Sequence, residues 1–194
     1  MKKKILIACE FSGIVRDSFS RMGWDAYSCD LLDTESELTK SEGKHLITDV
    51  ENILSEDWYM IIAFPPCTHL AASGARWFSE KIKDGRQAEA IRFFMLFANV
   101  NCRYVCIENP IGIMSNVYRK PDQILQPWQF GHEESKATCL WLKNLPVLKP
   151  TKIMEKRVPR VWLEAPGKDR WKRRSRTYKG IADAMAGQWT EFLM

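Results

Sequence analysis

The sequence predicts an α/β protein with a mostly parallel, doubly wound sheet and an antiparallel pair of strands toward the C-terminus. Short apolar, β-branched runs alternate with segments of helical periodicity through the first 110 residues, which is typical of strand–helix–strand crossovers. A hydrophobic fraction of 45% and a charged fraction of 27% in 194 residues indicate one globular core.

Five strands are expected in this first part, each of them a short apolar run: Lys4–Cys9, Ala26–Asp30, His45–Asp49, Met60–Phe64 and Tyr104–Glu108. Apolar residues at helical spacing predict helices over Ile14–Met22 and Gln87–Ala98.

The alternation of short strands and helices ends after Pro127. Lys136–Leu142 is expected to be a strand, and a proline-rich turn over Asn144–Pro150 would lead into a returning strand. Lys179–Leu193 has the periodicity of an amphipathic helix. One stripe of that helix is apolar and consists of Ile181, Met185, Trp189 and Phe192.

Several classes of protein are disfavoured by composition. No run is apolar and long enough to span a membrane, and the first apolar run reaches Glu10 too early for a signal peptide. The six cysteines form no CxxC pair and have no nearby pair of histidines, so neither a metal site nor a disulfide framework is expected. We therefore expect a cytoplasmic protein with reduced cysteines, no metal and no membrane partner.

The carboxyl ends of the expected strands carry polar residues. Ligands of open α/β sheets bind beyond these ends. Four strands end near an acid (Glu10, Asp30, Asp49 and Glu108), and the fourth strand in the chain ends near Cys67. Acids suit a ligand with hydrogen-bond donors and positive charge better than a triphosphate, and no phosphate-binding GxxxxGK[ST] loop is present.

Cys67 and Glu108 form the pair that carries chemistry. The thiol follows a rigid Pro65-Pro66 turn, and the carboxyl follows a neighbouring strand. A thiolate that adds to carbon 6 of cytosine makes carbon 5 nucleophilic, and a carboxyl group at ring N3 and the amine favours that addition. Taken alone, a Pro-Pro-Cys sequence is more often a turn with a buried cysteine; the ordered pair favours catalysis.

At these residues the chain resembles the S-adenosylmethionine-dependent DNA cytosine-5 methyltransferases, in particular the very short versions of phages and mobile elements. The resemblance covers residues 4–142 and resumes at Arg176. Phe11-Ser12-Gly13 looks like the F-x-G cofactor loop of that family. Pro66-Cys67 matches its catalytic Pro-Cys, and Glu108-Asn109 matches the Glu-Asn that holds the target base.

The resemblance implies a Rossmann-like methyltransferase fold with S-adenosyl-L-methionine as cofactor. Residues 1–150 would form the catalytic domain and residues 177–194 a helix packed against it. The implied catalytic set is Cys67, Glu108, Pro66, Asn109 and Lys136. The implied cofactor set is Phe11, Ser12, Gly13, Asp30, Leu31, Asp49, Phe64 and Pro65.

The chain departs from the family pattern at several positions. Val15 stands in place of a second loop glycine, and Thr68 in place of a glutamine after the catalytic Pro-Cys. The family's Q-x-R-x-R aligns with a segment in which Lys136 replaces the first arginine and Thr138 the second. Ile181 stands where the family has asparagine. Residues 151–176 replace a full target-recognition domain.

Positive charge is concentrated in and around that replacement segment. Residues 151–179 hold eleven Lys or Arg and three Asp or Glu, a local charge of +8 in a chain of net charge +5. Tryptophans among cations can stack on bases while phosphates are neutralised, although such a run is also compatible with a solvated surface. The predicted nucleic-acid-binding set is Arg76, Trp77, Arg157, Arg160, Arg170, Trp171, Lys172, Arg173 and Arg174.

The sequence thus favours methyl transfer to carbon 5 of cytosine in DNA. Three alternatives remain: the same chemistry on a free deoxycytidine nucleotide, a modified adenosylmethionine as donor, and a non-catalytic relic that binds nucleic acid. An amino-directed methyltransferase is less favoured, because such enzymes have an aromatic residue where this chain has Cys67. His69, two residues further on, is expected either to assist Cys67 or to make a simple loop hydrogen bond.

Overall fold

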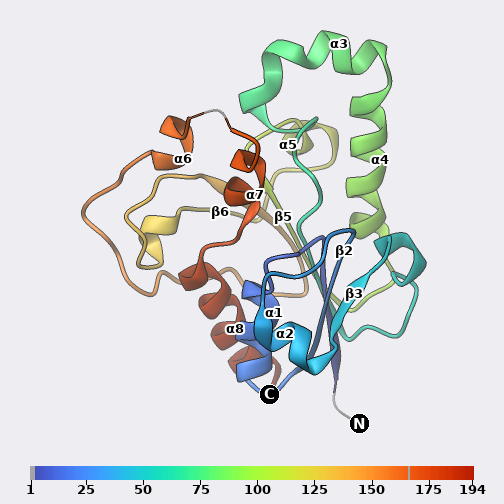
Figure 1. The fold of residues 1–194 in the computed structure, drawn as a ribbon, viewed down its shortest axis with the longest axis vertical. Coiled ribbons are helices and arrows are strands. Elements are labelled where there is room, and N and C mark those ends of the chain that lie inside the picture. Colours follow the sequence, from blue (N-terminus) through green and yellow to red (C-terminus); the bar gives the residue numbers. More distant parts are fainter. Residues whose placement is uncertain (1–2, 166) are drawn as a thin grey trace.

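A seven-stranded mixed sheet forms the centre of the molecule in the computed structural model, which describes residues 3–165 and 167–194. The strands lie in the order β3-β2-β1-β4-β5-β7-β6 (Figure 1). Their bounds are β1 Lys4–Ala8, β2 Asp25–Asp30, β3 His45–Ile47, β4 Met60–Ala63, β5 Tyr104–Pro110, β6 Gln123–Leu125 and β7 Thr138–Lys143. The first five strands are parallel, and β7 is antiparallel to both β5 and β6. The predicted α/β class, with its antiparallel strands near the C-terminus, is confirmed.

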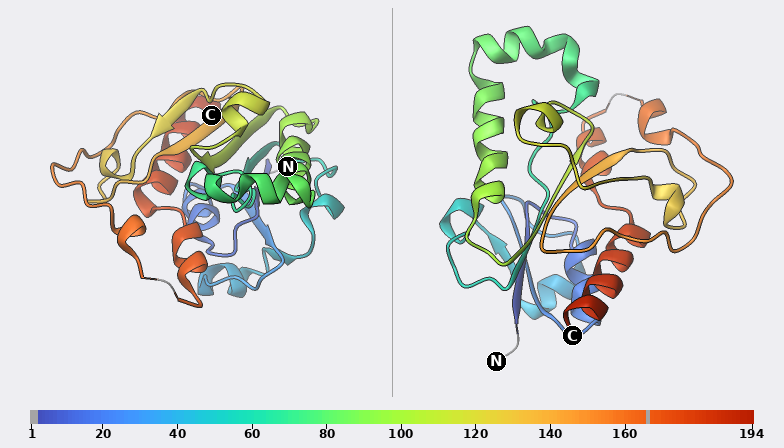
Figure 2. Two further views of the ribbon diagram at one scale, coloured as in Figure 1. Left: turned by 90° about the horizontal axis from the view of Figure 1, so that it is seen from above. Right: turned by 180° about the vertical axis from the view of Figure 1, so that it is seen from behind.

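Helices cover both faces of the sheet because side chains alternate along each strand. In β1, Ile5 and Ile7 pack in the core cluster that also contains residues of α1 (Ile14–Arg21) and α8 (Lys179–Leu193). Leu6 and Ala8 belong to the cluster on the other face, with residues of α4 (Arg86–Asn99). Figure 2 shows these helices on opposite sides of the sheet. The sheet is therefore doubly wound, as the alternating pattern predicts.

The C-terminal helix α8 packs on α1. Ser18 donates a hydrogen bond to Asp183 (2.8 Å), and the indole of Trp24 donates one to the hydroxyl of Thr190 (2.7 Å). Trp189 is fully buried. Phe192 is the exception to the predicted apolar stripe, because 56% of its surface is exposed in the last turn of the helix.

The C-terminal half differs from the expectation at one point. The partner of β7 is β6, which precedes it in the chain, and the described residues after Pro150 form no returning strand. Leu145 and Leu148 are buried in the core instead. Residues 152–158 run alongside residues 130–134 through two isolated bridges. The strand β6 has three residues, which is too short for a clear periodic signal, and this explains why the sequence does not predict it.

The remaining elements are short and lie in the connections. They are α2 Glu37–Glu42, α3 Phe78–Lys83, α5 Met114–Val117, α6 Arg160–Leu163 and α7 Arg170–Ser175, with the 3-10 helices η1 Val50–Asn52, η2 Ala72–Trp77 and η3 Pro127–Gln129. α3, α6 and α7 all lie beyond the carboxyl ends of the central strands (Figure 1). None of the helices in the described part of the chain has the length and apolar character of a membrane span.

Candidate active site

The turn that carries Cys67 is fixed by hydrogen bonds on both sides. The buried side chain of Asn109, in β5, donates to the carbonyl of Pro65 (2.8 Å). The carbonyl of Cys67 itself accepts from the backbone amides of Leu70 (3.0 Å) and Ala71 (2.9 Å). The Pro-Pro turn is rigid by sequence, and Asn109 attaches it to the neighbouring strand.

The loops after β4 and β5 are also joined to each other. The amide of Ala72 donates to the carbonyl of Ile111 (2.9 Å), and the amide of Ile113 donates to the carbonyl of Leu70 (3.0 Å). Gly112 lies so close to the other loop that a Cβ atom there would be 2.2 Å from the carbonyl oxygen of Leu70. The loop that holds Cys67 and the loop that follows Glu108 therefore form one rigid unit.

Cys67 lies beside charged groups rather than in the apolar core. It is partly exposed and belongs to neither core cluster, whereas four other cysteines are buried. Burial raises the pKa of the Cys67 thiol, the Glu108 carboxyl raises it further, and the cations of Lys136 and Arg174 act in the opposite direction. A nucleophilic thiol needs partial access and nearby positive charge, and Cys67 has both.

Glu108 is the second titratable group of this site. Burial raises the pKa of its carboxyl, while the ammonium of Lys136 and the hydroxyl of Thr138 lower it. A raised pKa favours the protonated carboxyl, which can donate a hydrogen bond to a ring nitrogen. The structure thus brings Cys67, Glu108 and Lys136 to one place, with Asn109 and Pro66 in the turn that supports them.

The Phe11-Ser12-Gly13 loop turns sharply from β1 into α1. Cys9 and Gly13 both have left-handed backbone conformations (φ of 59° and 72°). A Cβ atom at Gly13 would lie 2.5 Å from the side chain of Ser36, so this position needs glycine for two reasons. Phe11 and Ser12 are buried in the turn.

Glu10 does not line the ligand edge, contrary to the expectation for this strand end. Its buried carboxylate accepts hydrogen bonds from the amides of Val15 (2.8 Å) and Arg16 (3.3 Å) and from the hydroxyl of Ser12 (3.0 Å). It therefore occupies the free amides at the start of α1. Burial raises the pKa of Glu10 to about 7 in spite of these bonds.

Asp30 and Asp49 do lie at the ligand edge. Burial raises the pKa of the Cys9 thiol at the end of β1, and the nearby carboxyl groups of Asp30 and Asp49 raise it further. Asp30 accepts a hydrogen bond from the amide of Leu32 (3.0 Å), and Asp49 accepts one from the amide of Glu51 (3.0 Å). The side chain of Leu31, which follows Asp30 in the sequence, is 72% exposed. Two acids beside an exposed apolar side chain fit a ligand with hydroxyl groups and a flat ring.

Arg76 and Trp77 lie in η2, on the connection between the Cys67 turn and α3. Trp77 is 51% exposed, and the guanidinium of Arg76 lies 5.1 Å from the centre of its ring. This pair is therefore open to a partner, and its role in binding nucleic acid stays a prediction.

The basic segment, residues 151–176, folds back on the protein. The Arg157 guanidinium lies 3.8 Å from the ring centre of Trp128, and Arg160 forms an ion pair with Glu134 (2.8 Å). Arg173 pairs with Glu164, whose backbone carbonyl accepts a hydrogen bond from Arg170 (2.9 Å). Much of the local positive charge is therefore partly balanced by acids in the unbound protein.

The end of this segment, α7, lies over the Phe11-Ser12-Gly13 loop. The ring of Trp171 lies 6.2 Å from that of Phe11, and the ammonium of Lys172 lies 5.5 Å from the Phe11 ring. Arg176 forms two hydrogen bonds with Glu35 (2.7 and 2.8 Å). The sequence predicts Trp171 and Lys172 in a DNA-binding surface, but their contacts with Phe11 and Glu35 have no local sequence signal.

His69 lies near charged groups on or beside α3 and α4. Burial lowers the pKa of its imidazole, as do the cations of Lys81 and Arg86, while the carboxyl groups of Asp84 and Glu89 raise it. Its buried Nδ1 atom has no hydrogen-bond partner in the part of the chain that the structure describes. The two roles expected for His69, assistance to Cys67 or a loop hydrogen bond, stay predictions.

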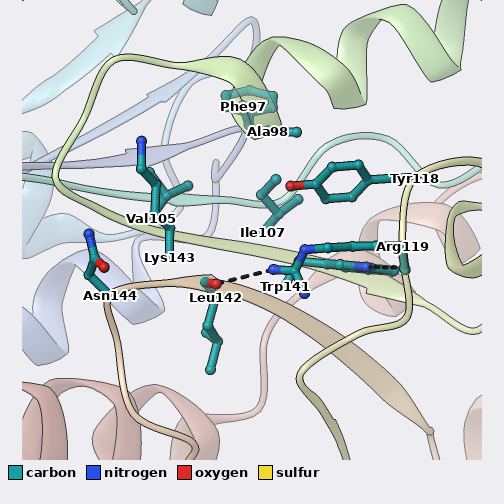
Figure 3. A pocket seen from close by; sticks show the side chains of 10 residues that line it. All are labelled: Phe97, Ala98, Val105, Ile107, Tyr118, Arg119, Trp141, Leu142, Lys143 and Asn144. Carbon is teal, nitrogen blue, oxygen red and sulfur yellow. Dashed lines mark hydrogen bonds between the residues drawn. The ribbon is translucent and has the colours of Figure 1, made fainter.

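A hollow elsewhere in the protein is unrelated to this chemistry. It has a volume of about 280 Å³ and lies between α4, β5 and β7, with Phe97, Tyr118, Arg119 and Trp141 in its wall (Figure 3). Neither Cys67 nor Glu108 lines it. Across residues 3–165 and 167–194, no group of three His, Cys, Asp or Glu side chains could hold a metal ion.

Comparison with solved structures identifies the fold. The Entamoeba histolytica methyltransferase EhMeth matches with a TM-score of 0.52 and 15% identity, over 79% of this chain and 58% of that chain. An rRNA methylase from Escherichia coli matches with a TM-score of 0.43 and 11% identity, over 74% of this chain and 57% of that chain. The chain thus spans less than two thirds of either protein. No family model and no curated protein sequence matches. The similarity to EhMeth shows a methyltransferase fold, as the sequence predicts.

Proposed function

We propose that the protein transfers a methyl group from S-adenosylmethionine to carbon 5 of cytosine in DNA, through a covalent bond between Cys67 and carbon 6. One observation carries this proposal. A partly exposed thiol stands on a braced turn at the end of β4, and the carboxyl of Glu108, beside Lys136, lies at the end of β5. The fold similarity to EhMeth supports methyl transfer in general.

In this reaction the Cys67 thiolate donates its electron pair to carbon 6 of the ring, and a sulfur–carbon bond forms. Glu108 hydrogen bonds to ring N3 and the exocyclic amine, which stabilises the charge that the ring acquires. Electron density then moves to carbon 5, which becomes nucleophilic. Carbon 5 would then take the methyl group, with the methyl–sulfonium bond broken and S-adenosylhomocysteine as the neutral leaving group, and loss of the carbon 5 proton to a base would restore the double bond. The sulfur–carbon bond breaks in that step, and Cys67 leaves as a thiolate.

The residues that follow or end β1, β2 and β3 fit the proposed cofactor. Asp30 and Asp49 offer carboxylates for hydroxyl and amine donors, and the exposed Leu31 offers an apolar surface for a ring. The tight turn at Gly13 brings backbone close to the same edge. Bound there, S-adenosylmethionine supplies an electrophilic methyl group on a sulfonium, whose positive charge suits an edge with two acids.

DNA is the substrate that the charge distribution favours over a free nucleotide. The helices α6 and α7 of the basic segment, and α3, which directly follows Arg76–Trp77 in the chain, lie beyond the carboxyl ends of the central strands (Figure 1), and Cys67 follows one of these ends, that of β4. Binding through several cations releases counterions from DNA, so affinity would fall steeply with salt. A nucleotide with few phosphates would show a much weaker dependence. The target base would have to leave the base stack to reach Cys67.

The test uses the full chain, duplex DNA and S-adenosylmethionine with a labelled methyl group, followed by digestion of the DNA to nucleosides. Label in 5-methyldeoxycytidine is expected, with complete loss in Cys67→Ser and strong loss in Glu108→Gln. Cys102→Ala is the matched control, because Cys102 precedes β5 at the opposite end of the sheet and should keep full transfer.

Other outcomes would contradict the proposal in distinguishable ways. Transfer that persists in Cys67→Ser would exclude the covalent mechanism. Label in free deoxycytidine nucleotide but not in DNA would identify the smaller substrate. A product heavier than a methyl group would indicate a modified donor. Failure to bind S-adenosylmethionine in calorimetry, with retained DNA binding, would leave a non-catalytic DNA-binding protein.

A further inference from the structure

The turn that carries Cys67 is also held from the side of α3 and α4. The ammonium of Lys81, in α3, donates a hydrogen bond to the backbone carbonyl of Thr68 (2.7 Å). The side-chain amide of Gln87, in α4, donates one to the backbone carbonyl of His69 (3.2 Å). Both side chains are buried, with 7% of the surface of each residue exposed. The two residues that follow Cys67 are thus each bound by a side chain from outside the turn.

Lys81 is an unusual residue for a buried position. Burial of an ammonium group is costly unless an acid or several acceptors compensate for it. Within the described ranges, Lys81 forms no salt bridge, and its side chain has one hydrogen bond, the one to Thr68. The nearby acids Glu80 and Asp84 pair with Arg86 instead. Packing alone therefore does not account for a lysine here, since an apolar side chain of similar shape would avoid the cost.

Cys67 lies between two attachments of the turn. On its N-terminal side, Asn109 from β5 holds the carbonyl of Pro65. On its C-terminal side, Lys81 from α3 holds the carbonyl of Thr68. Between them the chain turns back on itself through two backbone hydrogen bonds to the carbonyl of Cys67. The position of the thiol therefore depends on both attachments.

The same lysine joins the turn to the predicted DNA contact. The 3-10 helix η2, with Arg76 and Trp77, runs directly into α3. Gly74 of η2 lies so close to Lys81 that a Cβ atom at Gly74 would be 3.2 Å from the ammonium nitrogen. Lys81 therefore lies between η2 and the turn, and DNA bound at Arg76 and Trp77 would act on the element that holds Cys67.

We propose that Lys81 is a positioning residue for the reaction of Cys67: through the carbonyl of Thr68 it fixes the C-terminal half of the turn, so that the thiol meets the ring in the geometry that addition requires. Gln87 supports the same half of the turn. The effect on the turn stands on the hydrogen bond, whereas the effect on methyl transfer rests on the proposed function. Addition is sensitive to placement, because a shift of about 1 Å in the reacting groups can cost about a hundredfold in rate.

Hydrogen exchange measured by mass spectrometry tests the effect on the turn in the full chain, without DNA or cofactor. Lys81→Met removes the donor and keeps a long, unbranched side chain. Exchange over residues 67–72 should become about tenfold faster in this variant, while peptides from β1 and β4 keep the exchange of the wild type. Gln87→Met, which removes a longer hydrogen bond and no charge, should have a smaller effect of the same kind. Lys83→Met is the matched control, because Lys83 is exposed on the same helix; it should exchange as the wild type does.

Stability and kinetics separate positioning from a purely structural role. The Tm of Lys81→Met should equal or exceed that of the wild type, because an apolar group replaces a buried ammonium that has no acid partner among the described residues. In the transfer assay with duplex DNA, kcat should nevertheless fall about tenfold, while the KM for S-adenosylmethionine should change less than about twofold. Lys83→Met should keep both constants.

The inference is overturned if Lys81→Met exchanges over residues 67–72 as the wild type does, or if Lys83→Met has an equal effect. A lower Tm of Lys81→Met with unchanged kcat per folded molecule would also overturn it, since Lys81 would then stabilise the fold and nothing more. If Lys81→Met does not fold, Gln87→Met decides, and wild-type exchange and kcat in that variant overturn the inference.

Failure of the inference can be distinguished from failure of the proposed function. Wild-type exchange in a Lys81→Met enzyme that transfers methyl groups at the wild-type rate would contradict the inference alone. Faster exchange of the turn in Lys81→Met, in a protein whose wild type never transfers methyl groups, would contradict the proposed function alone.

Discussion

The two regions that surround Cys67 are held in place by different forces. The first, called the platform, consists of the loops after β1 and β4 and of the end of β5 with the loop that follows it (residues 9–13, 64–72 and 108–113). It is fixed by buried side chains and by backbone hydrogen bonds between loops. The second is the basic segment, residues 151–176, which is held by partly exposed ion pairs and ring contacts.

This difference separates two tasks. A buried hydrogen bond whose partner is removed costs about 1 to 3 kcal/mol, whereas an exposed ion pair contributes about 0 to 1 kcal/mol. The platform is therefore expected to resist salt and to keep the reacting groups in place. The basic segment is expected to loosen as salt rises, which suits an element that must exchange its own acids for phosphates.

The largest expected effect is on the platform, in Gly112→Ala. The added methyl group would meet the Leu70 carbonyl oxygen at 2.2 Å, and backbone atoms cannot move aside without separating the two loops. The free energy of unfolding should fall by about 3 kcal/mol, measured by urea denaturation. Gly187→Ala in α8 is the control, since nothing lies within 4 Å of the new methyl group; it should be neutral or slightly stabilising. Equal effects of the two substitutions would contradict the account of a rigid platform.

The next effect is a pH dependence that Glu10 contributes. Burial raises its pKa from 4.5 to about 7 in the folded protein. The unfolded chain therefore ionises first, and stability is lost as pH rises from about 4.5 to about 7, by up to about 3 kcal/mol. Glu10→Gln should show a flatter stability curve over this window in urea denaturation. Glu56→Gln, at an exposed site, should keep the wild-type dependence of unfolding free energy on pH. If Glu10→Gln also keeps it, the pKa of Glu10 does not differ between the folded and unfolded protein, and the prediction is contradicted.

A smaller effect is expected for Asn109→Ala. It removes the hydrogen bond to Pro65 and leaves a buried carbonyl without a donor, at a cost of about 2 kcal/mol in unfolding free energy. Because the Cys67 turn loses its brace, methyl transfer should fall even at temperatures where the variant is folded. Asn101→Ala, at an exposed site, should change neither quantity. Full transfer by a folded Asn109→Ala protein would show that the turn needs no brace.

The smallest effect on global stability is expected in the basic segment, for Glu35→Gln. It weakens the ion pairs with Arg176 and Lys172, which are partly exposed, so the unfolding free energy should change by less than about 1 kcal/mol. Trypsin should nevertheless cut residues 168–176 up to about fivefold faster, since about 1 kcal/mol changes an opening equilibrium by that factor. High salt should have the same effect on the wild type. Glu37→Gln is the control, because within residues 3–165 and 167–194 the carboxyl of Glu37 forms an ion pair with Lys40 alone. Equal cutting of both variants would contradict the account that Glu35 holds α7 in place.

The parts of this arrangement that follow from local pattern were predictable from the sequence. Parallel strands place their carboxyl ends at one edge, so Cys67 and Glu108 could be brought together from the positions of two strands alone. The strand bounds differ from the structure by one or two residues, because pattern fixes the centre of an element better than its ends.

The contacts between distant segments could not be predicted. The sequence predicts that Glu10 faces a ligand, because Glu10 follows a strand. In the structure it is buried, since its carboxyl accepts a hydrogen bond from an amide at the start of α1, a contact that the local pattern does not show. The short strand β6 has too few residues for a periodic signal. The position of α7 over Phe11 and Glu35 depends on ion pairs between residues about 140 apart, and a run of cations alone does not show which acids it will meet.

The central claim, a covalent bond from Cys67 to cytosine, is tested most directly by trapping that bond. Duplex DNA with 5-fluorocytosine in one strand is incubated with the full chain and S-adenosylmethionine. Fluorine cannot leave carbon 5 as a proton does, so the adduct should persist and be detected by mass spectrometry on the peptide that contains residue 67. The account predicts one such adduct, absent in Cys67→Ser. An adduct on another cysteine, or no adduct under conditions that methylate normal DNA, would contradict it.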